Sequence, residues 1–101
     1  MNRYDKIRDL HKFLLKRFRP KKKVILRFSR FMINHGSYKY SKNKHFITIR
    51  SQDSYAELIS DLCHEWSHCL EHHKWGTEHH SNAWGIKYSI VYRAYLEWLN
   101  L

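Results

Sequence analysis

Residues 54–73 of the chain are SYAELISDLCHEWSHCLEHH, and this stretch decides how the fold is interpreted. Ser54 and Glu57 form the S-x-x-E pattern of a capping box, which predicts that a helix begins here. Apolar side chains then recur every three or four residues, as on the buried face of a helix: Leu58, Ile59, Leu62, Trp66, Cys69 and Leu70. The stretch therefore predicts one amphipathic helix that extends to about His73.

The middle of this helix carries the motif H-E-x-x-H, from His64 to His68. Residues four apart in a helix lie ~40° apart around its axis and one turn apart along it, so both imidazoles can bind one metal ion. Glu65 lies ~100° around from His64, beside such an ion, where it can accept a proton from a zinc-activated water. The motif predicts a catalytic zinc site, and a solvated helix face with incidental histidines is the alternative interpretation.

A catalytic zinc needs three protein ligands and an open position, so a third ligand is expected from the histidines that follow: His72, His73, His79 and His80. His72 continues the same helix, and three consecutive turns, each rising ~5.4 Å, rarely converge on one ion. His79 and His80 follow the helix break expected at residues 75–77, where a chain reversal can return them to the site. We expect one zinc ion per chain, with His80 as the third ligand and His79 as the second choice.

The segments before and after this helix predict two further helices and a small sheet. Residues 2–19 carry an apolar stripe at helical spacing, and Pro20 ends that helix. The central region predicts a strand at 24–33, a turn at 34–37, an extended piece at 38–40, a hairpin loop at 42–44 and a strand at 45–50. Ser81 or Asn82 begins the last helix. The predicted class is α+β, with a two- or three-stranded antiparallel or mixed sheet.

The composition predicts one ordered domain. A chain of 101 residues, of which 43% are hydrophobic and 16% aromatic, can bury one core. No segment approaches the ~20 apolar residues of a membrane span, and no targeting segment is visible. Cys63 and Cys69 are six residues apart, on different faces of the predicted helix, so we expect reduced thiols and a cytoplasmic protein. Within 1–101 we distinguish a basic helix and connector at 1–23, strands at 24–50 and metal-site helices at 54–101.

The charge is divided unevenly between the two halves of the chain. Residues 1–50 hold 16 of the 19 Lys and Arg residues and 2 of the 9 acidic residues, which gives a net charge of +14. Residues 51–101 hold 3 Lys and Arg residues and 7 acidic residues, which gives a net charge of −4. The densest cationic run comprises Lys16, Arg17, Arg19, Lys21, Lys22 and Lys23. Such clusters bind phosphate backbones through counterion release, which predicts weak, non-specific binding of DNA or RNA. A solvated face that keeps a small protein soluble is the alternative.

Three segments resemble one known family. Residues 55–68 are similar to the active-site helix of the SprT-like (Spartan-type) zinc metallopeptidases, and residues 46–51 resemble the strand that precedes it. Residues 80–84, His-Ser-Asn-Ala-Trp, resemble the third-ligand segment, with Ser81 and Trp84 where the family has glycine and phenylalanine. The metzincin pattern is excluded, because Glu71 and Lys74 stand where it has glycine and histidine.

The resemblance implies a minimal zincin-like fold and a protein or peptide substrate, in a setting near DNA. It implies that His64, His68 and His80 bind zinc and that Glu65 is the general base. In zincin-like sites the substrate pairs with an exposed sheet edge, for which the strands at 38–40 and 46–50 are both candidates.

Two functions of different classes follow from these patterns. The first is a zinc metallopeptidase. The second is a non-catalytic, zinc-stabilised module that binds nucleic acid, in which a fourth protein ligand closes the zinc site. Glu65 separates the two, because hydrolysis needs a base beside the metal and a closed structural site does not. The sequence therefore favours the peptidase.

Overall fold

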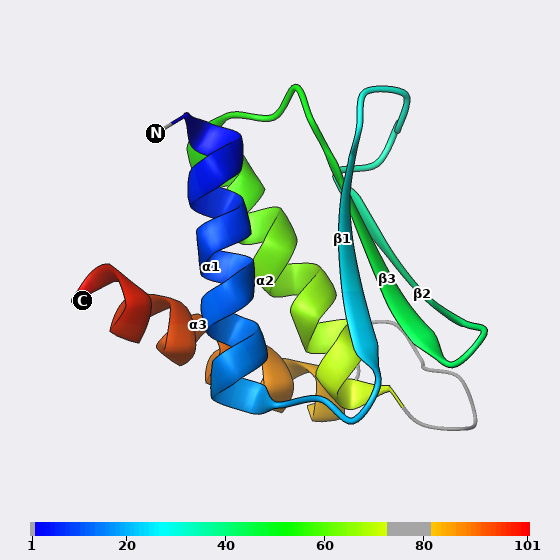
Figure 1. Cartoon of the computed structure of the whole chain (residues 1–101), viewed down its shortest axis with the longest axis vertical. Coiled ribbons are helices and arrows are strands. Elements are labelled where there is room, and N and C mark those ends of the chain that lie inside the picture. Colours follow the sequence, from blue (N-terminus) through cyan, green and yellow to red (C-terminus); the bar gives the residue numbers. More distant parts are fainter. Residues whose placement is uncertain (1, 73–81) are drawn as a thin grey trace.

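The computed structural model describes residues 2–72 and 82–101, and this part of the chain forms three helices and a three-stranded mixed sheet (Figure 1). The elements, in chain order, are α1 (Arg3–Phe18), β1 (Lys23–Ser29), β2 (Gly36–Ser41), β3 (Lys44–Arg50), α2 (Tyr55–Glu71) and α3 (Asn82–Leu99). The predicted α+β class is confirmed. No helix of the described ranges combines the length and apolar character that a bilayer span requires.

The sheet has the order β1-β3-β2, so β3 is its central strand. β1 runs parallel to β3, and β2 runs antiparallel to it. The β2–β3 hairpin turns at Lys42 and Asn43, whose φ angles of 54° and 61° are those of a type I′ turn. This turn lies within the predicted hairpin loop at 42–44. Alternate β3 residues, among them Ile47 and Ile49, are fully buried against the helices.

The predicted strand at 24–33 is wrong at its C-terminal end, because β1 ends at Ser29. The Ser29 hydroxyl accepts a hydrogen bond from the Phe31 backbone N–H at 3.2 Å, a local turn that competes with the sheet. Phe31 and Ile33 then lie 89% and 92% exposed, although their type favours strands. The turn predicted at 34–37 is also too long, since β2 already begins at Gly36.

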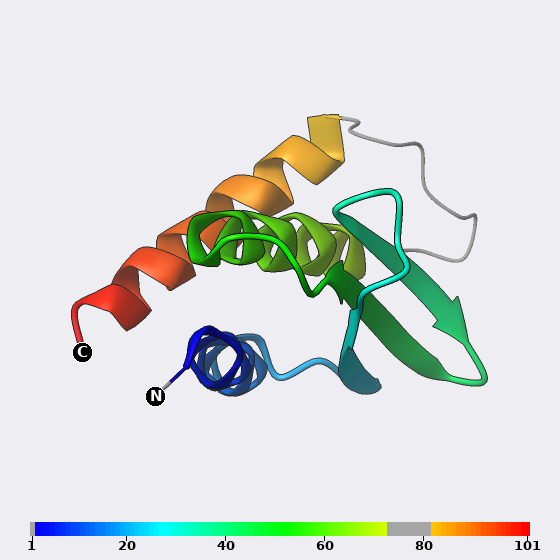
Figure 2. The same cartoon turned by 90° about the horizontal axis from the view of Figure 1, so that it is seen from above.

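The three helices lie on one side of the sheet, and α2 is enclosed between the sheet, α1 and α3 (Figure 2). The capping box that opens α2 is present: the Ser54 hydroxyl accepts from the Glu57 N–H at 3.2 Å, and the Glu57 carboxylate accepts from the Ser54 N–H at 2.9 Å. All residues of the predicted apolar stripe are buried except Leu70, which is half-buried. Cys63 and Cys69 are buried and free, as predicted.

His11 of α1 shows how this fold accommodates a histidine used for packing. The buried Trp66 indole N–H donates to His11 Nδ1 at 3.0 Å, so the ring proton is on Nε2, which donates to the Val24 carbonyl at 3.3 Å. Burial lowers the pKa of His11, although the Val24 hydrogen bond opposes the shift. Both ring nitrogens are therefore occupied by the protein itself, and His11 has no atom left for a ligand.

Candidate metal centre

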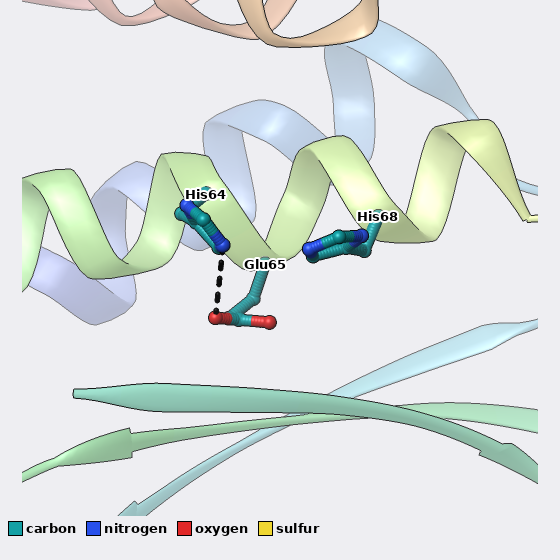
Figure 3. A group of neighbouring side chains, drawn as sticks. All are labelled: His64, Glu65 and His68. Carbon is teal, nitrogen blue, oxygen red and sulfur yellow. Dashed lines mark ion pairs between the residues drawn. The ribbon is translucent and has the colours of Figure 1, made fainter. Parts of the chain in front are cut away.

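α2 brings His64, Glu65 and His68 together as the helical spacing predicts (Figure 3). One ligand atom from each residue lies within 4.8 Å of the others. The two imidazole centroids are 5.0 Å apart, and His64 Nε2 lies 3.9 Å from Glu65 Oε2. The Glu65 carboxylate extends from α2 toward the sheet, between the two rings. Two imidazole nitrogens of this kind are ligands that zinc prefers, and the carboxylate lies beside them.

Glu65 is a buried carboxyl group that no Lys or Arg of the described residues balances, and its one recorded ion-pair contact is with the His64 imidazole at 3.9 Å. The residue is 5% exposed, and burial raises its pKa to about 7. Among the described residues, no Lys or Arg forms an ion pair with it. A metal ion between the two imidazoles would supply the missing positive charge, so the residues present fit a divalent cation.

Gly36 at the start of β2 makes room for this carboxylate. A Cβ atom at position 36 would lie 2.8 Å from Glu65 Oε2, closer than real Cβ atoms approach other heavy atoms, and in tight contact with its Cγ at 3.1 Å. The turn signal in the sequence includes this glycine, but it does not reveal that Glu65 lies against it. The backbone of β2 therefore forms the wall that holds the carboxylate beside the imidazoles.

Aromatic side chains flank the histidine pair on two sides. The Trp84 ring of α3 lies 5.0 Å from the His64 ring and 5.5 Å from the His68 ring, and Tyr38 of β2 stacks at 6.5 Å from His68. The Tyr38 hydroxyl is hydrogen-bonded to His45 Nδ1 at 2.7 Å, so it is directed away from the metal centre. Aromatic rings therefore pack against both imidazoles of the pair.

The histidines proposed as a third ligand divide into two groups. His72 packs on the sheet, with its ring 4.5 Å from Tyr40 and 5.7 Å from His45, and it does not join the His64 group within the described part of the chain. His73, His79 and His80 lie outside the described residues, as do the predicted helix break at 75–77 and Ser81.

A second polar cluster comprises His35 before β2, Asp53 before α2, and Asp61, which lies about one turn N-terminal to Glu65 on α2. His35 Nδ1 is 2.7 Å from Asp53 Oδ2 and 3.9 Å from Asp61 Oδ1. Arg50 donates to the other oxygen of Asp53 at 2.7 Å. This cluster is not evident in the sequence, because its members are spread over residues 35–61 and belong to no recognised motif.

The pKa values of the two carboxyl groups in this cluster shift in opposite directions. Burial raises the pKa of Asp61 to about 8, and the neighbouring Asp53 adds to the shift. Burial acts on Asp53 in the same sense, but hydrogen bonds from Asp61, His35 and Arg50 outweigh it and hold the pKa of Asp53 well below its usual range. At neutral pH, Asp53 is therefore ionised and Asp61 carries a proton.

A cavity of about 450 Å³ lies between α2 and the segment that leads into β2. It is lined by members of both clusters, together with the loop residues beside them: Ile33, Asn34, His35, Gly36, Ser60, Asp61, His64 and Glu65. A peptide segment bound in this cavity would therefore lie beside the imidazole of His64 and the carboxylate of Glu65.

The predicted nucleic-acid residues are all exposed: Lys16, Arg17, Arg19, Lys21, Lys22 and Lys23. They lie where α1 ends and β1 begins, at the end of the molecule where α2 also ends (Figure 1). Arg17 pairs with Glu97 of α3 at 3.0 Å, and both side chains remain over 40% exposed, at 44% and 43%. This basic run is separate in sequence and in fold from the second polar cluster.

Comparison with protein-family models, with curated proteins and with solved structures found no match to this chain.

Proposed function

We propose that this chain is a zinc metallopeptidase with a minimal zincin-like fold, in which His64 and His68 bind one zinc ion and Glu65 is the general base. The observation that carries the proposal is the placement of a buried carboxyl group between two imidazoles on α2, with no Lys or Arg to balance it in the described part of the chain. Burying a carboxyl group without a Lys or Arg beside it lowers the stability of the fold, which is typical of a functional site.

We assign His80 as the third ligand on the basis of the family resemblance and of one contact. Trp84 packs on both imidazoles, and it follows His80 by four positions in the chain. Four residues span at most ~14 Å, so His80 is tethered within reach of the site. His79 is tethered almost as closely and remains the second choice.

Zinc, when bound, supplies a Lewis acid that activates water and polarises a peptide carbonyl. Glu65 then accepts the proton of the attacking water and delivers it to the leaving amine. Its position beside His64, 3.9 Å from Nε2, is that of a proton acceptor adjacent to the ion. Burial against Gly36 restricts the motion of the carboxylate, so its orientation is set before substrate binds.

The sheet edge at β2 is the proposed binding surface for the peptide substrate. β3 is paired on both sides, which removes residues 46–50 from the two candidate edges. β2 pairs only with β3 in the described ranges, and it begins at the glycine beside Glu65. An extended peptide added to β2 would therefore pass along the cavity that contains the metal centre.

The test is cleavage of fluorescein-labelled casein by the zinc-loaded protein and by its Glu65→Gln variant. Removal of a general base reduces turnover by roughly 10²–10⁴-fold, so we expect at least ~100-fold slower cleavage in the variant. The variant keeps its zinc and its fold, since Glu65 is not a ligand in this proposal. Equal cleavage by the two proteins, or loss of zinc in the variant, contradicts the assigned role.

The second candidate function, a non-catalytic zinc-stabilised module that binds DNA or RNA, is favoured by the basic run of six exposed cations. Each phosphate contact adds about 0.9 to the slope of log affinity against log salt for duplex DNA. We expect the combined change of Lys21, Lys22 and Lys23 to Gln to reduce that slope and to leave the zinc content unchanged. An unchanged slope assigns these lysines to a solvated face. The free, buried thiols of Cys63 and Cys69 support a cytoplasmic location for either function.

A further inference from the structure

An aromatic cavity of about 360 Å³ lies between α2 and α3. Its walls include four tyrosine rings, one from α2 and three from α3: Tyr55, Tyr88, Tyr92 and Tyr95. Ile59 and Cys63, which are 8% and 0% exposed, line its buried side. Ala56 and Ser60 are exposed lining residues on α2, so the cavity opens to solvent along that helix.

The chemistry of the aromatic cavity suits a large apolar side chain. The described residues that line it include no charged group. Burial raises the pKa of Tyr88 and of Tyr95, so both phenols keep their protons at neutral pH. The Tyr88 hydroxyl and the Ser60 side chain are hydrogen-bonded to each other, so these two polar groups already have a partner. Aromatic walls with few polar groups are typical of cavities that bind ligands.

The aromatic cavity adjoins the metal centre at two points. Ser60 lines both this cavity and the cavity that contains His64 and Glu65. Ser60 precedes His64 by about one helical turn, a rise of ~6 Å, and only its small side chain separates the two cavities there. The Trp84 ring lies 5.0 Å from the His64 ring and 5.1 Å from the Tyr88 ring, so it connects the metal centre to the cavity wall.

From this continuity we infer that the aromatic cavity is the specificity pocket of the proposed peptidase and binds a large apolar side chain of the substrate. The inference rests on the proposed function, and it names the substrate class: peptides with an aromatic residue, leucine or methionine near the cleaved bond. An extended peptide rises ~3.3 Å per residue, so the ~6 Å between Ser60 and His64 corresponds to about two residues. The apolar residue should therefore lie within about three positions of the cleaved bond.

The cleavage sites of casein test this preference. Zinc-loaded wild type digests casein, and mass spectrometry of the products identifies the residues around every cut. We expect an aromatic residue, leucine or methionine to predominate at one fixed position within about three residues of the cut. An internally quenched peptide copied from one such site should lose roughly 10–100-fold in kcat/KM when that residue is replaced by serine, because burial of one large apolar side chain contributes about that factor.

A substitution that fills the aromatic cavity should remove the preference. Ala56 lines this cavity and not the one beside the metal centre, so Ala56→Phe adds a ring at the exposed rim. We expect this variant to cleave the two peptides equally well, and to cleave the serine peptide as fast as the wild type does. Ser89→Phe is the matched control, because Ser89 is exposed on α3 and lines neither cavity. It should retain the preference.

A second measurement does not depend on turnover. The Glu65→Gln variant keeps its zinc under the proposed function, and its affinity for the same two peptides, labelled with fluorescein, is measured by fluorescence anisotropy. We expect the apolar peptide to bind roughly 10–100-fold more tightly than the serine peptide. Tyr92→Ala removes a wall residue that is 45% exposed and should reduce this difference. It takes the place of Ala56→Phe if that variant does not fold.

The outcomes distinguish the two proposals. Casein cleavage without an apolar preference near the cut overturns the specificity pocket and leaves the peptidase intact. A preference that the folded variants at Ala56 and Tyr92 retain, or equal affinity of Glu65→Gln for the two peptides, has the same consequence. A zinc-loaded wild type that does not cleave casein overturns the peptidase and the pocket together.

Discussion

Two polar clusters lie side by side on α2, and they differ in how their charge is balanced. The cluster of His35, Asp53 and Asp61 contains its own cation, because Arg50 lies 2.7 Å from Asp53. The metal-centre cluster of His64, Glu65 and His68 has the same size and a similar set of atoms, but no Lys or Arg pairs with its carboxylate in the described residues. In the described part of the chain, Arg50 balances the carboxylate of Asp53, whereas no Lys or Arg balances that of Glu65.

The pKa values follow from that difference. Asp53 is buried, yet its partners hold its pKa well below the usual range, and the proton is displaced to Asp61. Glu65 is buried without such partners, and its pKa rises to about 7. The geometry of the ligand atoms does not show which of the two clusters is suited to a metal ion. The position of the Arg50 guanidinium does, because it lies beside Asp53 and not beside Glu65. This difference is the reason for proposing the metal at the His64 cluster and not at the His35 cluster.

The largest expected effect is the loss of zinc when one imidazole of the metal centre is removed. His68 is 7% exposed and is held between Tyr38 and Trp84. Residues that only hydrogen-bond to metal ligands contribute roughly 10–100-fold to metal affinity. Because His68 is a proposed ligand itself, His68→Ala should weaken zinc binding by more than ~100-fold. Competition with a chromogenic chelator measures the affinity. His72→Ala, one turn further along, is the matched control and should retain it. Equal affinities in the two variants would place the metal elsewhere.

A smaller effect is expected from closing the space beside Glu65. Gly36→Ala puts a methyl group 2.8 Å from Oε2, so the carboxylate must move away from its position next to His64. We expect roughly 10–100-fold slower casein cleavage with unchanged zinc content, the order of loss typical of a misplaced catalytic group. Gly85→Ala is the control, because nothing lies within 4 Å of a Cβ there. In the helix it should stabilise the protein by up to ~1 kcal/mol and leave activity unchanged. Full activity of Gly36→Ala would show that the position of Glu65 is not critical.

The local elements of the fold could be predicted from the sequence, and the pairing of distant segments could not. The capping box at Ser54 and the spacing of His64 and His68 are local, so α2 and its motif follow directly from the chain. The parallel pairing of β1 with β3 depends on how helices pack across the sheet, which no local pattern encodes. β1 was predicted too long because Phe31 has strand propensity but no partner strand.

The candidate site was predictable only as far as the motif extends. Glu65 and its two histidines are contiguous in sequence, whereas His35 and Asp53 are 18 residues apart and meet because β2 and β3 form a hairpin between them. The wall formed by Gly36 is likewise a consequence of the hairpin packing on α2. Whether His80 completes the site stays a prediction, since it lies outside the described residues.

The smallest expected effect is on the pH dependence of stability at the second cluster. The pKa of Asp61 rises from an ordinary value of 3.8 to about 8, so the folded state binds its proton more tightly than the unfolded chain. The free energy of unfolding should therefore fall as pH rises from about 4 to 8, which is opposite in sign to the contribution of Asp53. Asp61→Asn mimics the protonated form and should remove this part of the decline.

Urea unfolding of the metal-free protein at pH 5 and pH 8.5 measures the effect. At pH 5, the free energy of unfolding of Asp61→Asn should equal that of the wild type, apart from the contribution of one hydrogen bond. At pH 8.5, the free energy of unfolding of the variant should exceed that of the wild type by ~1–2 kcal/mol. The raised pKa of Glu65 also makes the free energy of unfolding fall with rising pH, but it does so in both proteins and therefore cancels in the comparison. A variant that is less stable than the wild type at pH 8.5 would mean that Asp61 is ionised in the native state.

The most direct test of the account is a crystal structure of the zinc-loaded protein, with anomalous diffraction measured on both sides of the zinc edge. We predict one anomalous peak per chain, between the imidazoles of His64 and His68, with nitrogen ligands at ~2.0–2.1 Å and an open position for water. Glu65 should lie beside the ion without binding it, and the His35 cluster should carry no peak. A peak between His35, Asp53 and Asp61, or a His64 site closed by a fourth protein ligand, would contradict the account.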